Sequence, residues 1–301
     1  MAYRTLQHGA RIVREGPRSV AARDLQRAGV AVRRFGRGLV SDVAPGALPL
    51  FIIGAQRSGT EVLVEALRKS PLVKVYNEHQ NSVAFRAFSL RSDDVVRNLV
   101  VKSRCRCVAF KALNDSHRIV HLLEHLGTPA HGRAIWIYRS VEARVRSAVA
   151  RFGDDELRIL RRIADGSLIG WERYLSEKKV ELVHSFDYDD MTPESAAALY
   201  WYLRNSLFFE LDLGQREDVL LASYEAIVAE PAHALKDICA FLGVPCSARL
   251  HDHIAPRPMP IERPLEIDGQ LGRLCAELYE RLEAERRARG LLPSVADLGG
   301  S

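Results

Sequence analysis

A glycine-bearing loop is the part of this sequence best suited to binding a charged ligand. It reads Gly54-Ala55-Gln56-Arg57-Ser58-Gly59-Thr60-Glu61 and lies between an apolar run and a segment with helical spacing. Such a strand–loop–helix unit points backbone N–H groups and the positive end of the helix dipole at an anion. A nucleotide triphosphatase would need lysine and then a hydroxyl residue after the second glycine, where this chain has Thr60 and Glu61. We therefore expect the loop to bind a phosphate group, but not the triphosphate of a magnesium–nucleotide complex. A glycine turn that binds no ligand is the alternative.

This loop resembles the 5′-phosphosulfate loop of the sulfotransferases that use 3′-phosphoadenosine 5′-phosphosulfate (PAPS). In that family a lysine or arginine precedes Ser-Gly-Thr after a strand, as Arg57 does here. The resemblance implies that Arg57, Ser58, Gly59 and Thr60 bind the 5′-phosphosulfate of PAPS, the donor co-substrate. It also implies a transfer that requires no metal, in agreement with the missing magnesium-binding hydroxyl.

Two further segments follow in the order and spacing of the same family. Arg139 comes directly after the apolar run 134–138, and Ser147 lies eight residues later in an expected helix. The resemblance implies that this pair binds the 3′-phosphate that distinguishes PAPS from ATP; an ordinary surface arginine and helix serine are the alternative. The third segment places Tyr224 at a strand end, before a proline-led helix that closes with Phe-Leu-Gly. The resemblance covers roughly residues 48–245 and adds Tyr224 to the donor site.

The catalytic residues are the point at which the sequence departs from the family pattern. Lys111 stands where cytosolic members have the first residue of Lys-x-His, but the histidine position is occupied by Leu113. Other members use a glutamate in the loop after the strand that follows the first helix, and Glu78 fits that placement. We predict Glu78 as the general base, with His79 as the second candidate and Lys111 as a further catalytic residue. A solvated loop carboxylate at Glu78 and a purely structural ion pair at Lys111 are the alternatives.

The expected activity is transfer of a sulfuryl group from PAPS to a hydroxyl group, or alternatively an amine, of a carbohydrate, lipid or small molecule. Asn114, Asp115 and His117 follow Lys111 closely enough to line the acceptor site. A phosphate-loop kinase or hydrolase with a degenerate loop, and a non-catalytic nucleotide-binding protein, are the other functions that we weigh. His121-Leu122-Leu123-Glu124-His125 matches the H-x-x-E-H zinc pattern, but a third ligand is not evident, and we expect no metal site.

The elements that must position these residues alternate between buried strands and helices. Short apolar runs at 50–53, 108–110, 134–138 and 219–222 predict buried strands, and the family resemblance implies a further strand at 73–76, before Glu78. The segments between them predict helices, including 115–126 closed by Gly127, a helix through Phe152, 154–182, and 231–242 ending at Gly243. Thr192-Pro193 predicts the start of another helix that runs to about 211. This order indicates an α/β fold with three layers, a mostly parallel sheet flanked by helices, as in phosphate-loop sulfotransferases.

Charge and composition indicate where the domains lie and which classes of partner the chain could bind. The 301 residues are 47% hydrophobic and 27% charged, which is typical of a folded globular protein and excludes a mainly disordered chain. Residues 1–40 hold nine arginines against two acidic residues, a balance of +7, so the rest of the chain sums to −2. We predict a basic N-terminal extension and linker over 1–46 and a sulfotransferase domain over 47–301.

The same charge distribution argues against nucleic acid as a partner, because the body of the chain carries no basic excess. The basic extension is suited to contact with an anionic membrane surface or a partner protein, and a solvated extension is the alternative. Five cysteines without a C-x-x-C pair indicate reduced thiols and a cytoplasmic location.

Overall fold

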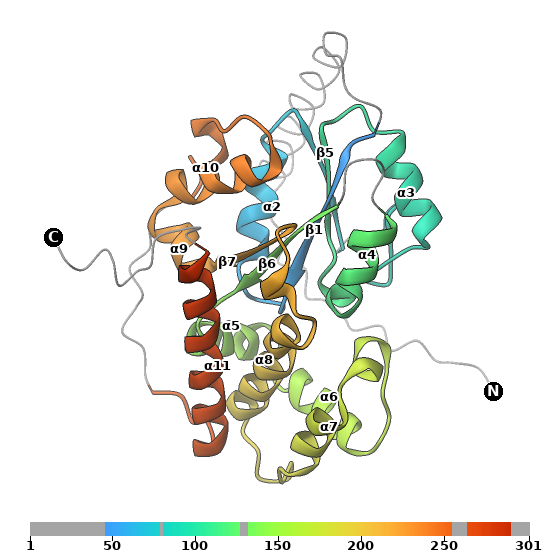
Figure 1. Cartoon of the computed structure of the whole chain (residues 1–301). Helices are drawn as coiled ribbons and strands as arrows, with labels where there is room; N and C mark the ends of the chain where they lie inside the picture. The colour runs from blue at the N-terminus through green and yellow to red at the C-terminus, as the bar shows by residue number, and fades with distance from the viewer. Residues whose placement is uncertain (1–45, 79–80, 127–131, 255–263, 290–301) are drawn as a thin grey trace, which may run out of the picture. The chain divides into compact units, whose positions relative to one another are not determined.

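The computed structural model describes residues 46–78, 81–126, 132–254 and 264–289, which all belong to one compact unit over 42–301. A five-stranded parallel sheet with the order β2-β5-β1-β6-β7 lies at its centre (Figure 1). The strands are β1 (Leu48–Gly54), β2 (Val73–Asn77), β5 (Cys107–Lys111), β6 (Arg133–Tyr138) and β7 (Val219–Ser223). Each of the five predicted strands is therefore confirmed.

The parallel arrangement brings the carboxyl ends of all five strands to one edge of the sheet. Gly54 at the end of β1 pairs in register with Ile137 of β6, and Asn77 at the end of β2 pairs with Lys111 of β5. The loops that leave this edge contain the phosphate loop, Glu78, Arg139 and Tyr224. Ligand sites of open α/β sheets form at this edge, because the loops there converge.

Helices cover both faces of the sheet and confirm the three-layer architecture. One face packs against α2 (Thr60–Arg68), α9 (Tyr224–Ala229) and α10 (Pro231–Leu242) through a core that includes Leu50 and Ile52 of β1. The opposite face, with Phe51 and Ile53, packs against α3 (Asp93–Val101), α4 (Ile119–His125), α5 (Val141–Phe152), α8 (Pro193–Glu210) and α11 (Gly269–Ala288). Because successive β1 side chains point to opposite layers, a continuous apolar run is what this strand requires.

A smaller helical layer packs on α8, and one prediction is wrong there. Residues 154–182 do not form one helix but α6 (Asp155–Ala164), the 3-10 helix η2 (Gly170–Tyr174) and α7 (Glu177–His184, Figure 1). Gly166 and Gly170 have φ values of 77° and 62°. Gly166 follows the C-cap of α6 and ends that helix, whereas Gly170 is the first residue of η2. The second break follows at Leu175 and Ser176, which have extended backbone.

The remaining helices follow the sequence pattern with local differences. The Thr192 hydroxyl accepts from the Ser195 N–H at 3.1 Å, so the predicted cap of α8 is confirmed. The segment predicted as a helix over 115–126 starts instead with a 3-10 helix, η1 (Leu113–Arg118), and its predicted end at Gly127 lies outside the described residues. The sequence patterns did not indicate the hairpin of β3 (Phe85–Arg86) and β4 (Ser89–Leu90), or the helices α3, α9 and α11. Two short 3-10 helices, η3 (Leu213–Gln215) and η4 (Ala248–Leu250), complete the set.

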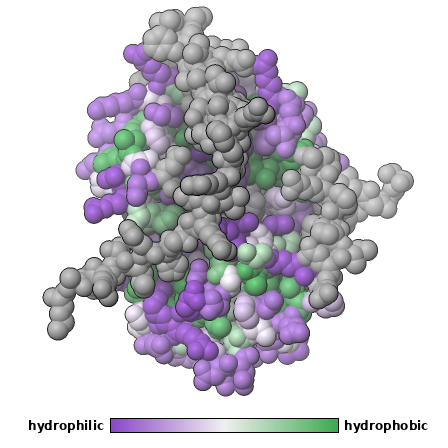
Figure 2. Space-filling model, turned by 180° about the vertical axis from the view of Figure 1, so that it is seen from behind, coloured by the Kyte–Doolittle hydropathy of each residue, from purple (hydrophilic) through white to green (hydrophobic). Residues whose placement is uncertain are grey.

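The basic extension predicted over 1–46 lies outside the described residues except for Gly46. No helix within the described part of the chain is long and apolar enough to cross a membrane. Outside the grey segments, hydrophilic residues cover most of the face in Figure 2, and hydrophobic residues gather there in smaller patches. The five cysteines are free thiols.

Candidate active site

Two glycines of the phosphate loop are required by close approach of neighbouring groups. Gly54 and Gly59 have φ values of 128° and 85°, in the region that favours glycine. A Cβ atom on Gly54 would lie closer than 3 Å to the carbonyl oxygen of Ile137, and one on Gly59 would overlap the Tyr224 ring. The loop is thus fitted between β6 and the start of α9. Tyr224, predicted for the donor site, lies against the middle of the loop.

The predicted donor residues Arg57, Arg139 and Ser147 lie together beside this loop. Arg57 Nε donates to Ser147 Oγ at 3.0 Å, and Arg139 Nη1 donates to the Arg57 carbonyl at 3.4 Å. The Arg139 guanidinium also lies 4.5 Å from the centre of the Tyr224 ring, a cation–π distance. Three segments that are far apart in sequence therefore form one cationic cluster.

The charges in this cluster favour an anion. Partial burial lowers the pKa of Arg57, and the nearby charges of Arg151, Arg139 and Arg144 lower it further. Within the described chain, no carboxylate forms an ion pair with Arg57 or Arg139. A bound phosphate would relieve the mutual repulsion of these guanidinium groups.

Several buried polar atoms of the loop region make no hydrogen bond in the described structure. They are Ser58 Oγ, Arg139 Nε and Ser140 Oγ, and the Ser58 side chain is fully buried. Buried polar groups nearly always have a partner, so these atoms are available to hydrogen-bond with a bound molecule. These atoms fit an anionic ligand held by the loop. Thr60, the remaining predicted loop residue, starts α2 and is buried.

Two buried arginines, Arg144 and Arg204, donate hydrogen bonds to backbone carbonyls of the loop. The sequence analysis identified neither of them. Arg144 Nε donates to the Gln56 carbonyl at 3.1 Å, while its Nη1 donates to Glu156 Oε2 at 2.7 Å. Arg204 Nη2 donates to the Gly54 carbonyl at 3.2 Å and to Ser116 Oγ at 3.3 Å. Burial lowers the pKa of Arg204, and its Nε and Nη1 make no hydrogen bond with described residues. A charged residue within an otherwise apolar stretch of α8 was the only signal for Arg204 in the sequence.

The predicted catalytic residues Lys111 and Glu78 meet at the carboxyl ends of β5 and β2. Lys111 Nζ lies 2.7 Å from Glu61 Oε1 and 3.4 Å from Glu78 Oε1. Glu78 is only 5% exposed, and its Oε2 accepts from the Leu113 N–H at 3.1 Å. The alternative of a solvated loop carboxylate at Glu78 is therefore wrong. His79, the second candidate for the base, lies outside the described residues.

The 3-10 helix η1 forms the other wall beside the loop. Asn114 Oδ1 accepts from the Gln56 side chain at 3.2 Å, which ties η1 to the phosphate loop. His117 stacks on the exposed ring of Tyr174 at 4.3 Å, and burial with the nearby charge of Arg204 lowers its pKa to about 4. Asp115 instead accepts from the Leu90 N–H at 2.8 Å, toward the β3–β4 hairpin. Of the three expected acceptor-site residues, Asn114 contacts the phosphate loop, His117 packs on Tyr174 of η2, and Asp115 supports the hairpin.

The histidines of the H-x-x-E-H pattern have other partners. His121 and His125 stack on each other at 4.4 Å on α4, and His121 Nε2 lies 2.6 Å from Asp93 Oδ2. Over the residues that the structure describes, no group of three potential metal ligands comes together.

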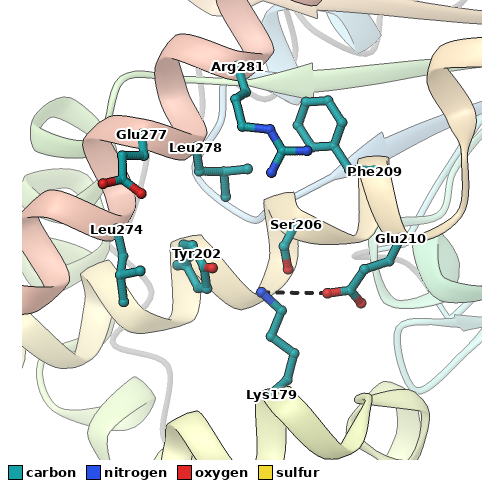
Figure 3. Close-up of a pocket in the computed structure, with 9 residues that line it drawn as sticks. All are labelled: Lys179, Tyr202, Ser206, Phe209, Glu210, Leu274, Glu277, Leu278 and Arg281. Carbon is teal, nitrogen blue, oxygen red and sulfur yellow. Dashed lines mark ion pairs between the residues drawn. The ribbon is translucent and has the colours of Figure 1, made fainter.

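A separate cavity of about 280 Å³ lies between α7, α8 and α11 (Figure 3). Lys179 reaches into it, 3.9 Å from the centre of the Tyr202 ring and 3.5 Å from Glu210 Oε1. Arg281 stacks on Phe209 at 4.2 Å on the opposite side. The cavity contains none of the predicted site residues.

Comparison with known proteins gives similarity in structure alone. No family model matches the chain, and no curated protein matches it. A sulfotransferase from Alicyclobacillus acidocaldarius is 18% identical, with a TM-score of 0.44, over 82% of this chain and 97% of that chain. A sulfotransferase from Mycobacterium avium is 15% identical, with a TM-score of 0.46, over 87% of this chain and 82% of that one. A mouse sulfotransferase complexed with PAP is 17% identical, with a TM-score of 0.37, over 74% and 67% of the two chains. These similar structures are all sulfotransferases.

Proposed function

We propose that this chain is a sulfotransferase that takes its sulfuryl group from PAPS. The observation that carries the proposal is the hydrogen-bonded cluster of Arg57, Arg139 and Ser147 beside a glycine-constrained phosphate loop. A donor with a phosphate at each end of its ribose needs two anion sites a few ångströms apart. In this proposal the loop supplies one, and Arg139 after β6 together with Ser147 in the middle of α5 supplies the other.

In this proposal each residue of the cluster has a distinct partner on the donor. The backbone amides and side chains of Ser58 and Thr60, the amide of Gly59 and the Arg57 guanidinium bind the 5′-phosphosulfate. Arg139 and Ser147 bind the 3′-phosphate, through Nε and Oγ respectively. Tyr224, whose ring lies against Gly59 and Arg139, supports the nucleotide at the loop. Charge-assisted bonds of this kind are about twice as strong as neutral ones.

The transfer step requires little covalent chemistry from the protein. The acceptor oxygen forms a bond to sulfur as the bond between sulfur and the 5′-phosphate oxygen breaks, and the phosphate leaves with that electron pair. Glu78 takes the proton of the acceptor hydroxyl, and Lys111 donates to the oxygen that develops charge. The acceptor is a hydroxyl group of a carbohydrate, lipid or small molecule, with an amine as the alternative. Asn114 and His117 line its side of the loop.

The position of Glu61 argues against a magnesium triphosphate enzyme. This residue occupies the place of the magnesium-binding hydroxyl, and its carboxylate accepts a hydrogen bond from Lys111 at 2.7 Å. The loop lysine that would neutralise a triphosphate is replaced by Thr60, and the hydroxyl that would bind magnesium is replaced by Glu61. A kinase or hydrolase is therefore the weaker proposal.

Calorimetry with adenosine 3′,5′-bisphosphate and ADP tests the proposed donor. We expect the bisphosphate to bind at least tenfold more tightly, because only it offers a 3′-phosphate to Arg139 and Ser147. Equal affinities for the bisphosphate and ADP in the presence of EDTA would be compatible with a non-catalytic nucleotide-binding protein. Such a result would contradict selectivity for PAPS. Magnesium-dependent binding of ADP would favour the kinase or hydrolase.

We further propose a cytoplasmic enzyme with its catalytic domain over 47–301 and a basic extension over 1–46 that contacts an anionic membrane surface or a partner. Deletion of residues 1–40 should leave bisphosphate binding intact, since all proposed donor contacts lie at residue 57 or later. Loss of binding to anionic vesicles in the truncated protein would support membrane contact. A truncated protein that folds but no longer binds the bisphosphate would contradict the domain boundary.

A further inference from the structure

Lys111 is shared by two carboxylates, and it lies closer to the one that the proposed reaction does not use. Its Nζ is 2.7 Å from Glu61 Oε1 but 3.4 Å from Glu78 Oε1. The Lys111 side chain is 3% exposed and that of Glu78 is 5%, whereas that of Glu61 is 46% exposed. Electrostatic interactions in such a buried place are weakly screened, so the position of this ammonium group matters to both carboxylates.

The Glu61 carboxylate is held in place from three elements. It belongs to the first turn of α2, whose N-terminal dipole favours a negative charge. The Asn77 side chain at the end of β2 donates to both of its oxygens, at 3.0 and 3.3 Å. Lys111 at the end of β5 supplies the third contact. A carboxylate fixed in this way can hold the lysine ammonium at a defined place.

Glu78 is held separately. Its Oε2 accepts from the Leu113 N–H at 3.1 Å, and only Oε1 faces Lys111. The charge of Arg204 on α8 also acts on Glu78, and the charge of Arg57 on the loop acts on Glu61. Replacing Glu61 does not change these two arginines. The effect of the replacement on Glu78 therefore comes from the altered position of Lys111 and from the loss of the Glu61 charge.

We infer that Glu61 is a positioning residue that holds Lys111 nearer to itself than to Glu78 and so keeps Glu78 a stronger proton acceptor. Without Glu61, the lysine would lose its nearest carboxylate, and its charge would act more strongly on Glu78 and stabilise the ionised form of that residue. A carboxylate so stabilised is a weaker base. The importance of this arrangement for catalysis rests on the proposed function, but the arrangement itself does not.

Titration of Glu78 in the free protein tests the inference without donor or acceptor. The full chain is labelled with glutamate carrying ¹³C at the side-chain carboxyl, and the Glu78 resonance is assigned from its loss in Glu78→Gln. In Glu61→Gln we expect the titration midpoint of Glu78 to fall by about one pH unit, because it loses a like charge and gains the lysine. A midpoint that is unchanged or raised would overturn the inference.

Glu65→Gln is the matched control, because it makes the same change one turn later on α2. The Glu65 side chain is 52% exposed and pairs with Arg68, not with Lys111. It should leave the Glu78 midpoint where it is in the unaltered protein. An equal fall in Glu65→Gln would show a general charge effect and would overturn the role given to Glu61.

Lys111→Met shows whether the effect passes through the lysine. In that background Glu61→Gln should lower the Glu78 midpoint by less than half as much as in the unaltered protein. A fall of full size would overturn the role of Lys111, and the Glu61→Gln result decides the inference if Lys111→Met fails to fold. Binding of adenosine 3′,5′-bisphosphate is measured separately. A protein that shows the expected titration but no bisphosphate binding would refute the proposed function alone.

Discussion

Arg57 donates from Nε to the hydroxyl of Ser147 at 3.0 Å, although 90 residues separate them in the sequence. This contact joins the loop predicted to bind the 5′-phosphosulfate to the helix predicted to bind the 3′-phosphate. Arg57 lies in the loop after β1 and Ser147 on α5 after β6, and β1 and β6 are neighbours in the sheet. The pairing of these two strands is thus what places both predicted anion-binding groups at one site.

Arg139→Ala and Ser147→Ala should weaken the binding of adenosine 3′,5′-bisphosphate far more than the binding of 5′-AMP. Both side chains are proposed to contact only the 3′-phosphate, and a charge-assisted bond from the arginine contributes about 1.5–3 kcal/mol. We therefore expect a loss of about 10- to 100-fold for the bisphosphate in Arg139→Ala, measured by calorimetry. Arg158→Ala, an exposed arginine on α6 that pairs with Asp154, serves as control. Equal losses for both nucleotides would contradict the assignment.

Glu78→Gln should lower turnover by about 10²- to 10⁴-fold, because the amide cannot accept the acceptor proton. Affinity for adenosine 3′,5′-bisphosphate should barely change in this variant. The measurement is release of the bisphosphate from PAPS with an acceptor found by screening hydroxyl compounds. His79→Ala should have the smaller effect, and a carboxylate base predicts that activity rises through acidic pH. Near-normal turnover in Glu78→Gln with collapse in His79→Ala would assign the base to the histidine.

Gly59→Ala should destabilise the protein through two separate costs. Its φ of 85° is unfavourable for alanine by about 1–2 kcal/mol, and the overlap with Tyr224 adds about 1–3 kcal/mol. Gly166→Ala is the matched control, because its φ is 77° but nothing lies within 4 Å of the added Cβ. Urea unfolding should show the larger loss for Gly59→Ala. The additional change Tyr224→Ala should recover part of that loss and leave the cost of the φ angle.

The lowered pKa of His117 predicts that the folded protein loses stability in mild acid. Burial, and then the charge of Arg204, lowers its pKa from 6.5 to about 4 in the folded protein. The unfolded chain therefore binds a proton at a higher pH than the folded protein, so this contribution is complete above 6.5 and decreases as pH falls toward about 4. His117→Gln should flatten the dependence of the urea midpoint on pH between these values. His184→Gln, at an exposed site on α7, should leave it unchanged.

The sequence alone was sufficient for the sheet, the loop and the order of the donor residues. Four of the five strands are continuous apolar runs, as expected of strands buried on both faces, and could be recognised without tertiary information. The strand β2 contains the exposed Lys74 and was placed through the family resemblance. Gly54 and Gly59 could also be recognised, because their spacing between a strand and a helix is a local pattern. Thr192 and Pro193 marked the start of α8 for the same reason.

Only the tertiary structure decided which polar side chains pair in the interior. Glu61 was evident as a residue unsuited to magnesium, but its contact with Lys111 depends on β1 and β5 lying side by side. Arg144 and Arg204 bind backbone carbonyls of the loop from α5 and α8, 88 and 150 residues away from their partners. Hydrogen bonds between such distant residues leave no periodic or local pattern, because they follow from packing of helices on the sheet. The sequence therefore indicated most of the candidate site residues, and the fold determined which of them contact one another and added Arg144 and Arg204.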